Sequence, residues 1–62
     1  MTLYEKLPND PIMLLSFINT RLRDSYESLE DFCAATGADI KEIVTKLRAV
    51  DYEYDADRNQ FV

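Results

Sequence analysis

The sequence predicts a mainly α, α+β domain in which three helices precede a C-terminal β-hairpin. Three consecutive segments carry apolar residues at helical spacing, and the last segment changes to the alternating spacing of a strand. Gly37 lies between the second and third helical segments, where a tight turn can join two short helices. This order is typical of a helix-turn-helix core followed by a wing. We therefore expect a winged-helix-like single domain over residues 1–62.

The first helix is expected over residues 11–26, after an N-terminal arm at residues 1–8. Asp10 suits the N-cap position, and Pro11 suits the first helical position because its missing N–H is not needed there. Six of the seven residues from 12 to 18 are apolar. At 100° per residue a core stripe forms, consisting of Leu14, Leu15, Ile18, Leu22 and Tyr26, with Ile12 at its edge. Met13 and Phe17 lie on the opposite side and need a second cover.

Two short helices are expected over residues 29–36 and 40–50. Ser28 and Asp39 begin them as N-caps, and Gly37 ends the first of them in the left-handed region. The second helix is expected to bury Leu29, Phe32, Cys33 and Thr36. The third is expected to bury Ile40, Ile43, Val44, Leu47 and Val50.

Residues 52–62 are expected to form the hairpin. Tyr52 and Tyr54 alternate with acidic residues, which predicts a strand with one buried face. Residues 55–59 are rich in turn-forming side chains, and the chain then returns with Phe61 pointing inward. Residues 26–28 are a candidate for a very short third strand.

The composition excludes several kinds of chemistry. One cysteine and no histidine allow no intrachain disulfide, no Cys/His metal site and no imidazole base. The alternating carboxylates after residue 50 fail the calcium-loop pattern, since Ala56 replaces its glycine and Val62 its bidentate glutamate. Cys33 lies on an apolar stripe and is expected to act as a small buried hydrophobic residue. We expect no catalytic residue, no metal and no cofactor, and therefore no enzyme.

The apolar run at residues 12–18 is too short to span a bilayer, which requires about 20 residues. It also lacks the basic leader and the small-residue cleavage site of a signal peptide. A small domain without disulfides suits a reducing compartment. We therefore expect a cytoplasmic protein with no membrane partner.

Several short motifs are spread over nearly the whole chain. They are Leu7-Pro8-Asn9-Asp10-Pro11, Met13-Leu14-Leu15-Ser16-Phe17, Asn19, Leu22-Arg23-Asp24, Ser28-Leu29, Tyr52-Glu53-Tyr54-Asp55 and Asn59-Gln60-Phe61-Val62. This set resembles a family of short bacterial proteins that is known only as a domain of unknown function. The resemblance implies a small stand-alone bacterial protein without an assigned activity.

The second half of the chain also resembles the winged helix-turn-helix modules of bacterial regulators. Such proteins often have glycine after the third helix, where this chain has Asp51. If that position needs a positive φ, aspartate tolerates it at a cost of roughly 1 kcal/mol.

A protein interface is the favoured functional surface. Its candidate residues lie on the arm and on the outer side of the first helix: Leu3, Tyr4, Leu7, Met13 and Phe17. A helix that is apolar on both sides in so short a chain indicates a second contact surface. The partner is another protein or a second copy of the chain, as in a homodimer. The alternative is that the arm or the hairpin covers Met13 and Phe17 within one chain.

DNA binding is the second candidate function. The third helix would enter the major groove with Lys41, Thr45, Lys46 and Arg48, and Arg21 and Arg23 would reach phosphates. The net charge of −5 disfavours this function. Residues 38–50, which include the third helix, carry only +1, and residues 51–62 carry −3, which would repel the phosphate backbone.

Overall fold

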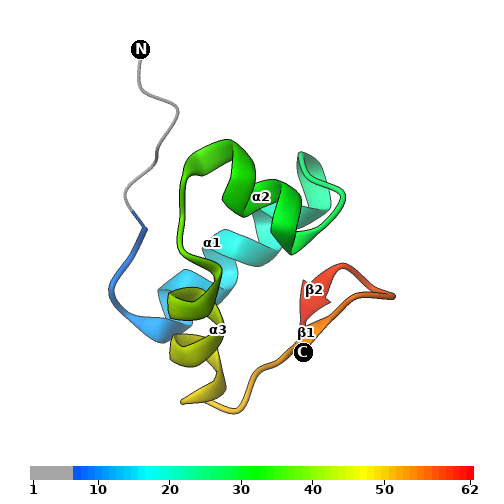
Figure 1. Ribbon diagram of the computed structural model, residues 1–62. Helices are drawn as coiled ribbons and strands as arrows, with labels where there is room; N and C mark the ends of the chain where they lie inside the picture. The colour runs from blue at the N-terminus through cyan, green and yellow to red at the C-terminus, as the bar shows by residue number, and fades with distance from the viewer. Residues whose placement is uncertain (1–6) are drawn as a thin grey trace.

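The computed structural model describes residues 7–62, so Leu3 and Tyr4 of the expected interface lie outside the described residues. Three helices are followed by a two-stranded antiparallel sheet (Figure 1). The elements are α1 (Pro11–Asp24), α2 (Leu29–Thr36), α3 (Ile40–Arg48), β1 (Tyr54–Asp55) and β2 (Gln60–Phe61). The predicted fold class, a small α+β domain of three helices and a C-terminal hairpin, is confirmed.

One cluster of side chains forms the core, and all three helices and β2 contribute to it. The buried members are Leu14, Ile18, Leu22, Leu29, Phe32, Ile43, Leu47 and Phe61. The rings of Tyr26 and Phe32 meet edge to face, with their centroids 5.3 Å apart. Helix α1 contacts α2, α3 and β2, so the other elements pack around it.

The start of α1 differs from the prediction in two details. Pro11 occupies the first turn as expected, but Asp10 accepts the N–H of Leu14 through its backbone carbonyl, at 2.8 Å. The side chain of Asp10 makes no capping hydrogen bond, so that part of the prediction is wrong. Ile12 was expected at the edge of the core, yet it is 55% exposed. It lies two turns before Asn19 on the same side of α1, and the hairpin packs beside Asn19 instead.

The two short helices begin and end with the predicted caps. The Ser28 hydroxyl accepts the N–H of Asp31 at 3.0 Å, and the Asp39 carboxylate accepts the N–H of Lys41 at 2.9 Å. Gly37 ends α2 with a φ of 81°, in the left-handed region. The turn between the two helices therefore has the chemistry that the sequence predicted.

Helices α1 and α3 end two residues earlier than predicted, at Asp24 and Arg48. After α3, Asp51 has a φ of 70°, and its N–H donates to the carbonyl of Arg48 at 2.9 Å. A residue in the left-handed region cannot continue a helix, so the chain turns away here. Ile40 was expected to be buried but is 36% exposed, since the first turn of α3 lies at the rim of the core.

The hairpin is shorter than the predicted range of residues 52–62. Tyr54 pairs with Phe61, and Asp55 pairs with Gln60. The Asp55 carboxylate shapes the turn by accepting the N–H of Asp57 at 3.0 Å. Within residues 7–62 the sheet has two strands, and residues 26–28 do not add a third.

Asn19 fastens β2 to α1. Its side-chain Nδ2 donates to the carbonyl of Phe61 at 3.1 Å, and its Oδ1 accepts the N–H of the same residue at 2.8 Å. The side-chain amide thus replaces a neighbouring strand and satisfies both backbone groups of Phe61. This contact sets where the hairpin lies on α1.

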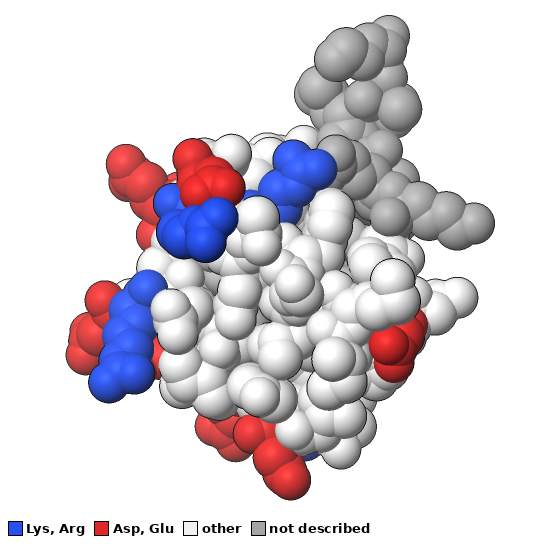
Figure 2. Space-filling view, turned by 180° about the vertical axis from the view of Figure 1, so that it is seen from behind, with Lys and Arg blue, Asp and Glu red and all other residues white. Residues whose placement is uncertain are grey.

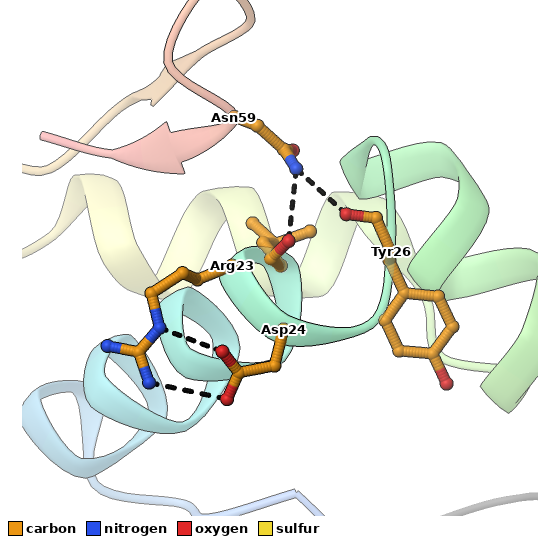
Figure 3. A network of polar contacts seen from close by, with 5 residues as sticks. Arg23, Asp24, Tyr26 and Asn59 are labelled. Atoms are coloured by element: carbon orange, nitrogen blue, oxygen red, sulfur yellow. Dashed lines mark hydrogen bonds and ion pairs between the residues drawn. The ribbon is translucent and has the colours of Figure 1, made fainter.

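Asn59 links the hairpin to the ends of two helices (Figure 3). With a φ of 54°, it donates from Nδ2 to the carbonyls of Leu22 and Tyr26, at 3.2 and 2.9 Å. Its Oδ1 accepts the Tyr54 hydroxyl proton at 2.7 Å, and that hydroxyl accepts the N–H of Leu29 at 3.2 Å. Leu22 is in the last turn of α1 and Leu29 in the first turn of α2, where backbone groups lack helical partners.

Candidate interaction surfaces

Met13, Ser16, Phe17, Thr20 and Arg21 share one side of α1, which we call the outward face. Met13 is 62% exposed, whereas Phe17 is half-buried and packs partly against the core. The Arg21 guanidinium lies over the Phe17 ring, 4.9 Å from its centroid. The outward face therefore presents an exposed methionine beside an aromatic ring that an arginine partly covers.

The outward face is uncharged over most of its length. No Lys, Arg, Asp or Glu occurs from residue 11 to residue 20. Figure 2 views the molecule from the side on which α1 lies, and charged side chains there stand around a broad uncharged middle. Because 31% of all residues are charged, this side is distinct from the rest of the surface.

Two further apolar residues that the sequence did not assign to a site are also exposed. Ile12 is 55% exposed and Val62 is 45% exposed. Strand β2 runs antiparallel to α1, because residues 59 and 61 bond to residues 22 and 19 in turn. Val62 therefore continues toward the N-terminal half of α1. Helical spacing could have located Ile12, but the place of Val62 depends on how the hairpin docks.

Charged residues lie at both ends of the outward face. Asp10 precedes the first turn of α1, and Arg21 lies on the same side three turns later. Nearby, Arg23 donates to the Asp24 carboxylate with Nε–Oδ1 at 2.9 Å (Figure 3). This hydrogen bond lowers the pKa of the Asp24 carboxyl. Asp24 also lines a shallow hollow together with Phe17 and Arg21, so this end of the face carries charges of both signs.

Leu7 lies at a different place from the other described residues of the predicted interface. It is half-buried against the core and lines a hollow with Leu14 and Ile43, between α1 and α3. Neither Met13 nor Phe17 lines this hollow. The structure thus brings Met13 and Phe17 together and places Leu7 against α3.

The outer side of α3 carries part of the predicted nucleic-acid surface. Lys41, Thr45 and Arg48 line one shallow hollow together with Ile40 and Val44. Arg48 Nε lies 3.9 Å from Glu53 Oε2. One of the two basic residues that line this hollow therefore faces a carboxylate. The described surface here is apolar and weakly basic.

Lys46 does not join that hollow. Its Nζ lies 3.6 Å from Oε2 of Glu42, one turn earlier on α3. Both residues line the hollow that contains Leu7. The four residues of the predicted nucleic-acid surface are therefore divided between two sides of α3.

Cys33 has the character expected of a half-buried hydrophobic residue. Burial raises the pKa of its thiol above the ordinary value, and the negative charge of Asp39 acts in the same direction. The reactive thiolate is therefore disfavoured at neutral pH. Among residues 7–62 no group of three or more Asp, Glu, Cys or His side chains is placed to hold a metal ion. No helix in this part of the chain is long and apolar enough to cross a bilayer.

The fold and its surfaces define a small three-helix domain with a docked C-terminal hairpin and a helix face that is uncharged from residue 11 to residue 20. The model of the family described as a domain of unknown function (DUF4250) matches residues 8–61, and the chain belongs to this family. The predicted membership of a family of unknown function is thus confirmed. No curated protein and no solved structure matches the chain.

Proposed function

We propose that this protein is a non-catalytic protein-interaction or oligomerisation module whose contact surface is the outward face of α1. One observation supports this function above the others: Met13 is 62% exposed in the first turn of α1, where no charged residue occurs from position 11 to position 20. Apolar patches with a polar rim are typical of protein contact sites. Methionine also suits such a surface because its flexible side chain adapts to a partner.

Burial of this face would supply a useful free energy. Full burial of a methionine or isoleucine side chain contributes about 1.5–3 kcal/mol. Met13 and Ile12 are 62% and 55% exposed, so more than half of their surface can still be removed from water. Burial of these two side chains can favour a complex by a few kcal/mol before the entropy of association is counted.

DNA binding by α3 has weaker support. Lys41 and Arg48 are the basic residues on its outer hollow, and Arg48 faces Glu53. Because most non-specific affinity for DNA comes from neutralised phosphates, a −5 protein with this small basic area is poorly suited to it. We place the protein in the bacterial cytoplasm, where the free thiol of Cys33 stays reduced.

Site-specific photocrosslinking tests the proposed contact surface. A photoreactive phenylalanine derivative replaces Met13 in the full chain, which is expressed in the cells that normally contain the protein. We expect irradiation to give a discrete crosslinked species. A matched probe replaces Lys41, an exposed position on α3, and we expect no such species from it.

A second substitution shows whether the crosslink depends on the face. Ser16 is exposed and lies on the same side of α1 as Met13, so Ser16→Glu adds a charge without removing a core contact. We expect it to reduce the crosslinked species from position 13 at least about fivefold, as an unpaired charge is buried in the contact. Equal crosslinking from position 41, or none from position 13, would contradict the proposed surface.

A further inference from the structure

We infer that a hollow between the hairpin and the first turns of α2 and α3 binds a cationic segment of a partner protein, in which an apolar side chain lies beside Lys or Arg. This hairpin hollow has a volume of about 370 Å³ and is lined by residues 27–30, Ile40, Tyr54 and Ala56. The Leu29 N–H donates to the Tyr54 hydroxyl, which brings the hairpin beside the start of α2 (Figure 1). None of these residues belongs to the outward face, so the inference adds a second contact surface to the proposed function.

Four of the lining residues supply apolar surface to the hairpin hollow: Leu29, Ile40, Tyr54 and Ala56. Leu29 belongs to the buried core and Tyr54 packs partly against it, so these two side chains are held in place. Ile40 is 36% exposed, and Ala56 is exposed in the hairpin turn. An apolar hollow of this kind can receive one apolar side chain from a partner, as anchoring residues do in protein interfaces.

The neutral polar groups of the hairpin hollow already have partners within the chain. The Ser28 hydroxyl accepts the hydrogen bond that caps α2, and the Tyr54 hydroxyl both donates and accepts a hydrogen bond. Glu27 and Glu30 are exposed, and neither forms an ion pair with another residue of the described range 7–62. These two carboxylates therefore determine which charge the hollow favours in a ligand, and they favour a cation that donates hydrogen bonds.

The two segments that form the hairpin hollow are acidic throughout. Residues 24–40 contain five Asp or Glu residues and residues 49–57 contain four, and neither segment contains Lys or Arg. Lys41, which follows the first segment, lines the hollow on the outer side of α3 instead. Arg58, which follows the second, lies with its Nε 3.7 Å from Oδ2 of Asp55. A surface with one sign of charge attracts partners of the opposite sign and repels anionic ones such as nucleic acids.

A cationic protein segment matches both properties of the hairpin hollow. A small metal ion would use the carboxylates but would leave the apolar walls in contact with water. An uncharged apolar ligand would fill the hollow but would gain nothing from Glu27 and Glu30. Because both carboxylates are exposed, each ion pair contributes little by itself, and the apolar side chain has to supply much of the affinity. We therefore expect a weak, reversible contact.

Fluorescence anisotropy with the purified full chain tests the inference. The probe is a labelled peptide in which one leucine lies between two pairs of arginines, and its matched control has serine in place of the leucine. At about 50 mM salt we expect the leucine peptide to bind with a dissociation constant on the order of 100 µM. The serine peptide should bind about tenfold more weakly, because it loses the apolar contact. Equal binding of the two peptides, or no binding of the leucine peptide up to about 1 mM, overturns the inference.

Substitutions in the protein locate the contact. Ala56 and Ala35 are both exposed, but only Ala56 lines the hairpin hollow. Ala56→Arg places a bulky cation there and should weaken binding of the leucine peptide about tenfold or more, whereas Ala35→Arg, with the same change of charge on α2, should alter it less than about twofold. Glu27→Gln should weaken binding about two- to threefold. Asp10→Asn removes one charge outside the hollow and should leave the dissociation constant unchanged.

The outcomes distinguish a defined site from a general attraction of opposite charges. If Ala35→Arg weakens binding as much as Ala56→Arg, net charge alone attracts the peptide and the inference is wrong. Circular dichroism of each variant verifies that the helices are still folded, so a loss of binding cannot be assigned to unfolding. The crosslink from position 13 tests the outward face separately. Failure of either experiment therefore leaves the result of the other intact.

Discussion

Asn59 combines two requirements that few side chains meet together. Its φ of 54° lies in the left-handed region, which asparagine tolerates better than most residues. Its amide donates both protons to carbonyls, those of Leu22 and Tyr26, and accepts one from Tyr54. Glycine would satisfy the backbone but would leave the carbonyl of Leu22 without this donor. Aspartate would also tolerate the backbone conformation, but its carboxylate oxygens would face the carbonyl oxygens of Leu22 and Tyr26.

Asn59→Asp should therefore destabilise the protein at pH 7. A carboxylate in place of the amide loses two donated hydrogen bonds and faces the two carbonyls, which should reduce the free energy of unfolding by about 2 kcal/mol or more. Thermal unfolding followed by circular dichroism measures the change. Asn9→Asp makes the same amide-to-acid change at an exposed residue before α1 and should change the free energy of unfolding by less than about 0.5 kcal/mol. Equal losses from both variants would contradict this role of the Asn59 amide.

The loss caused by Asn59→Asp should also depend on pH. The carbonyls raise the pKa of the new carboxyl in the folded state, since they disfavour its charged form. A group with a raised folded pKa stabilises the fold most when it is protonated, and that stability is lost as the pH rises above the unfolded pKa of about 4. The difference from the unsubstituted chain should therefore be smaller at about pH 3.5 than at pH 7. A difference that is constant with pH would argue against the carbonyl contacts.

At the scale of the elements, the stops after α2 and α3 use the same backbone conformation with different residues. Gly37 has a φ of 81° and Asp51 has a φ of 70°. Glycine reaches this region without a penalty, whereas the Cβ of an aspartate clashes there. The exit from α3 is therefore the less favourable of the two stops.

Asp51→Gly should stabilise the protein. Relief of the left-handed penalty is offset in part by the greater freedom of glycine in the unfolded chain, so we expect a gain of about 0.5 kcal/mol. In a domain of this size that gain raises Tm by about 2–4 °C. Asp51→Asn removes the charge but keeps the tolerance for positive φ, and it isolates the electrostatic part. Ala34→Gly, in the exposed middle of α2, should lose about 1 kcal/mol. If Asp51→Gly is as destabilising as Ala34→Gly, the explanation is wrong.

Features set by neighbouring residues in the sequence, such as the helix caps, could be predicted. Features set by how the hairpin packs on α1 could not. The caps at Ser28, Gly37 and Asp39 act within four residues of themselves, so the sequence shows them directly. Asn59 donates hydrogen bonds to Leu22 and Tyr26, which precede it by 37 and 33 positions in the sequence. No local sequence pattern indicates contacts over such a separation. The hairpin position that leaves Ile12 exposed depends on the same contacts. The separation of Lys46 from Lys41 was predictable, because five residues turn a helix by about 140°.

At the scale of the whole molecule, the small core makes stability sensitive to any binding of a partner. A single core in 62 residues supplies only a few kcal/mol of stability, and every element adds to one cluster. A second copy that binds the folded chain but not the unfolded chain stabilises the fold by mass action. Self-association through the outward face would therefore make Tm rise with protein concentration, whereas a monomer would have a constant Tm.

The charge distribution makes a clear prediction about DNA. The net charge is −5, residues 51–62 carry −3, and the outer hollow of α3 has Lys41 and Arg48 as its basic residues. We expect no micromolar binding to a labelled mixed-sequence duplex in a fluorescence anisotropy titration at about 50 mM salt, where phosphate contacts are strongest. The contrary result is binding that falls steeply with salt. If Lys41→Glu abolished that binding and Lys46→Glu did not, the outer side of α3 would be a DNA surface, because only Lys41 lines that hollow.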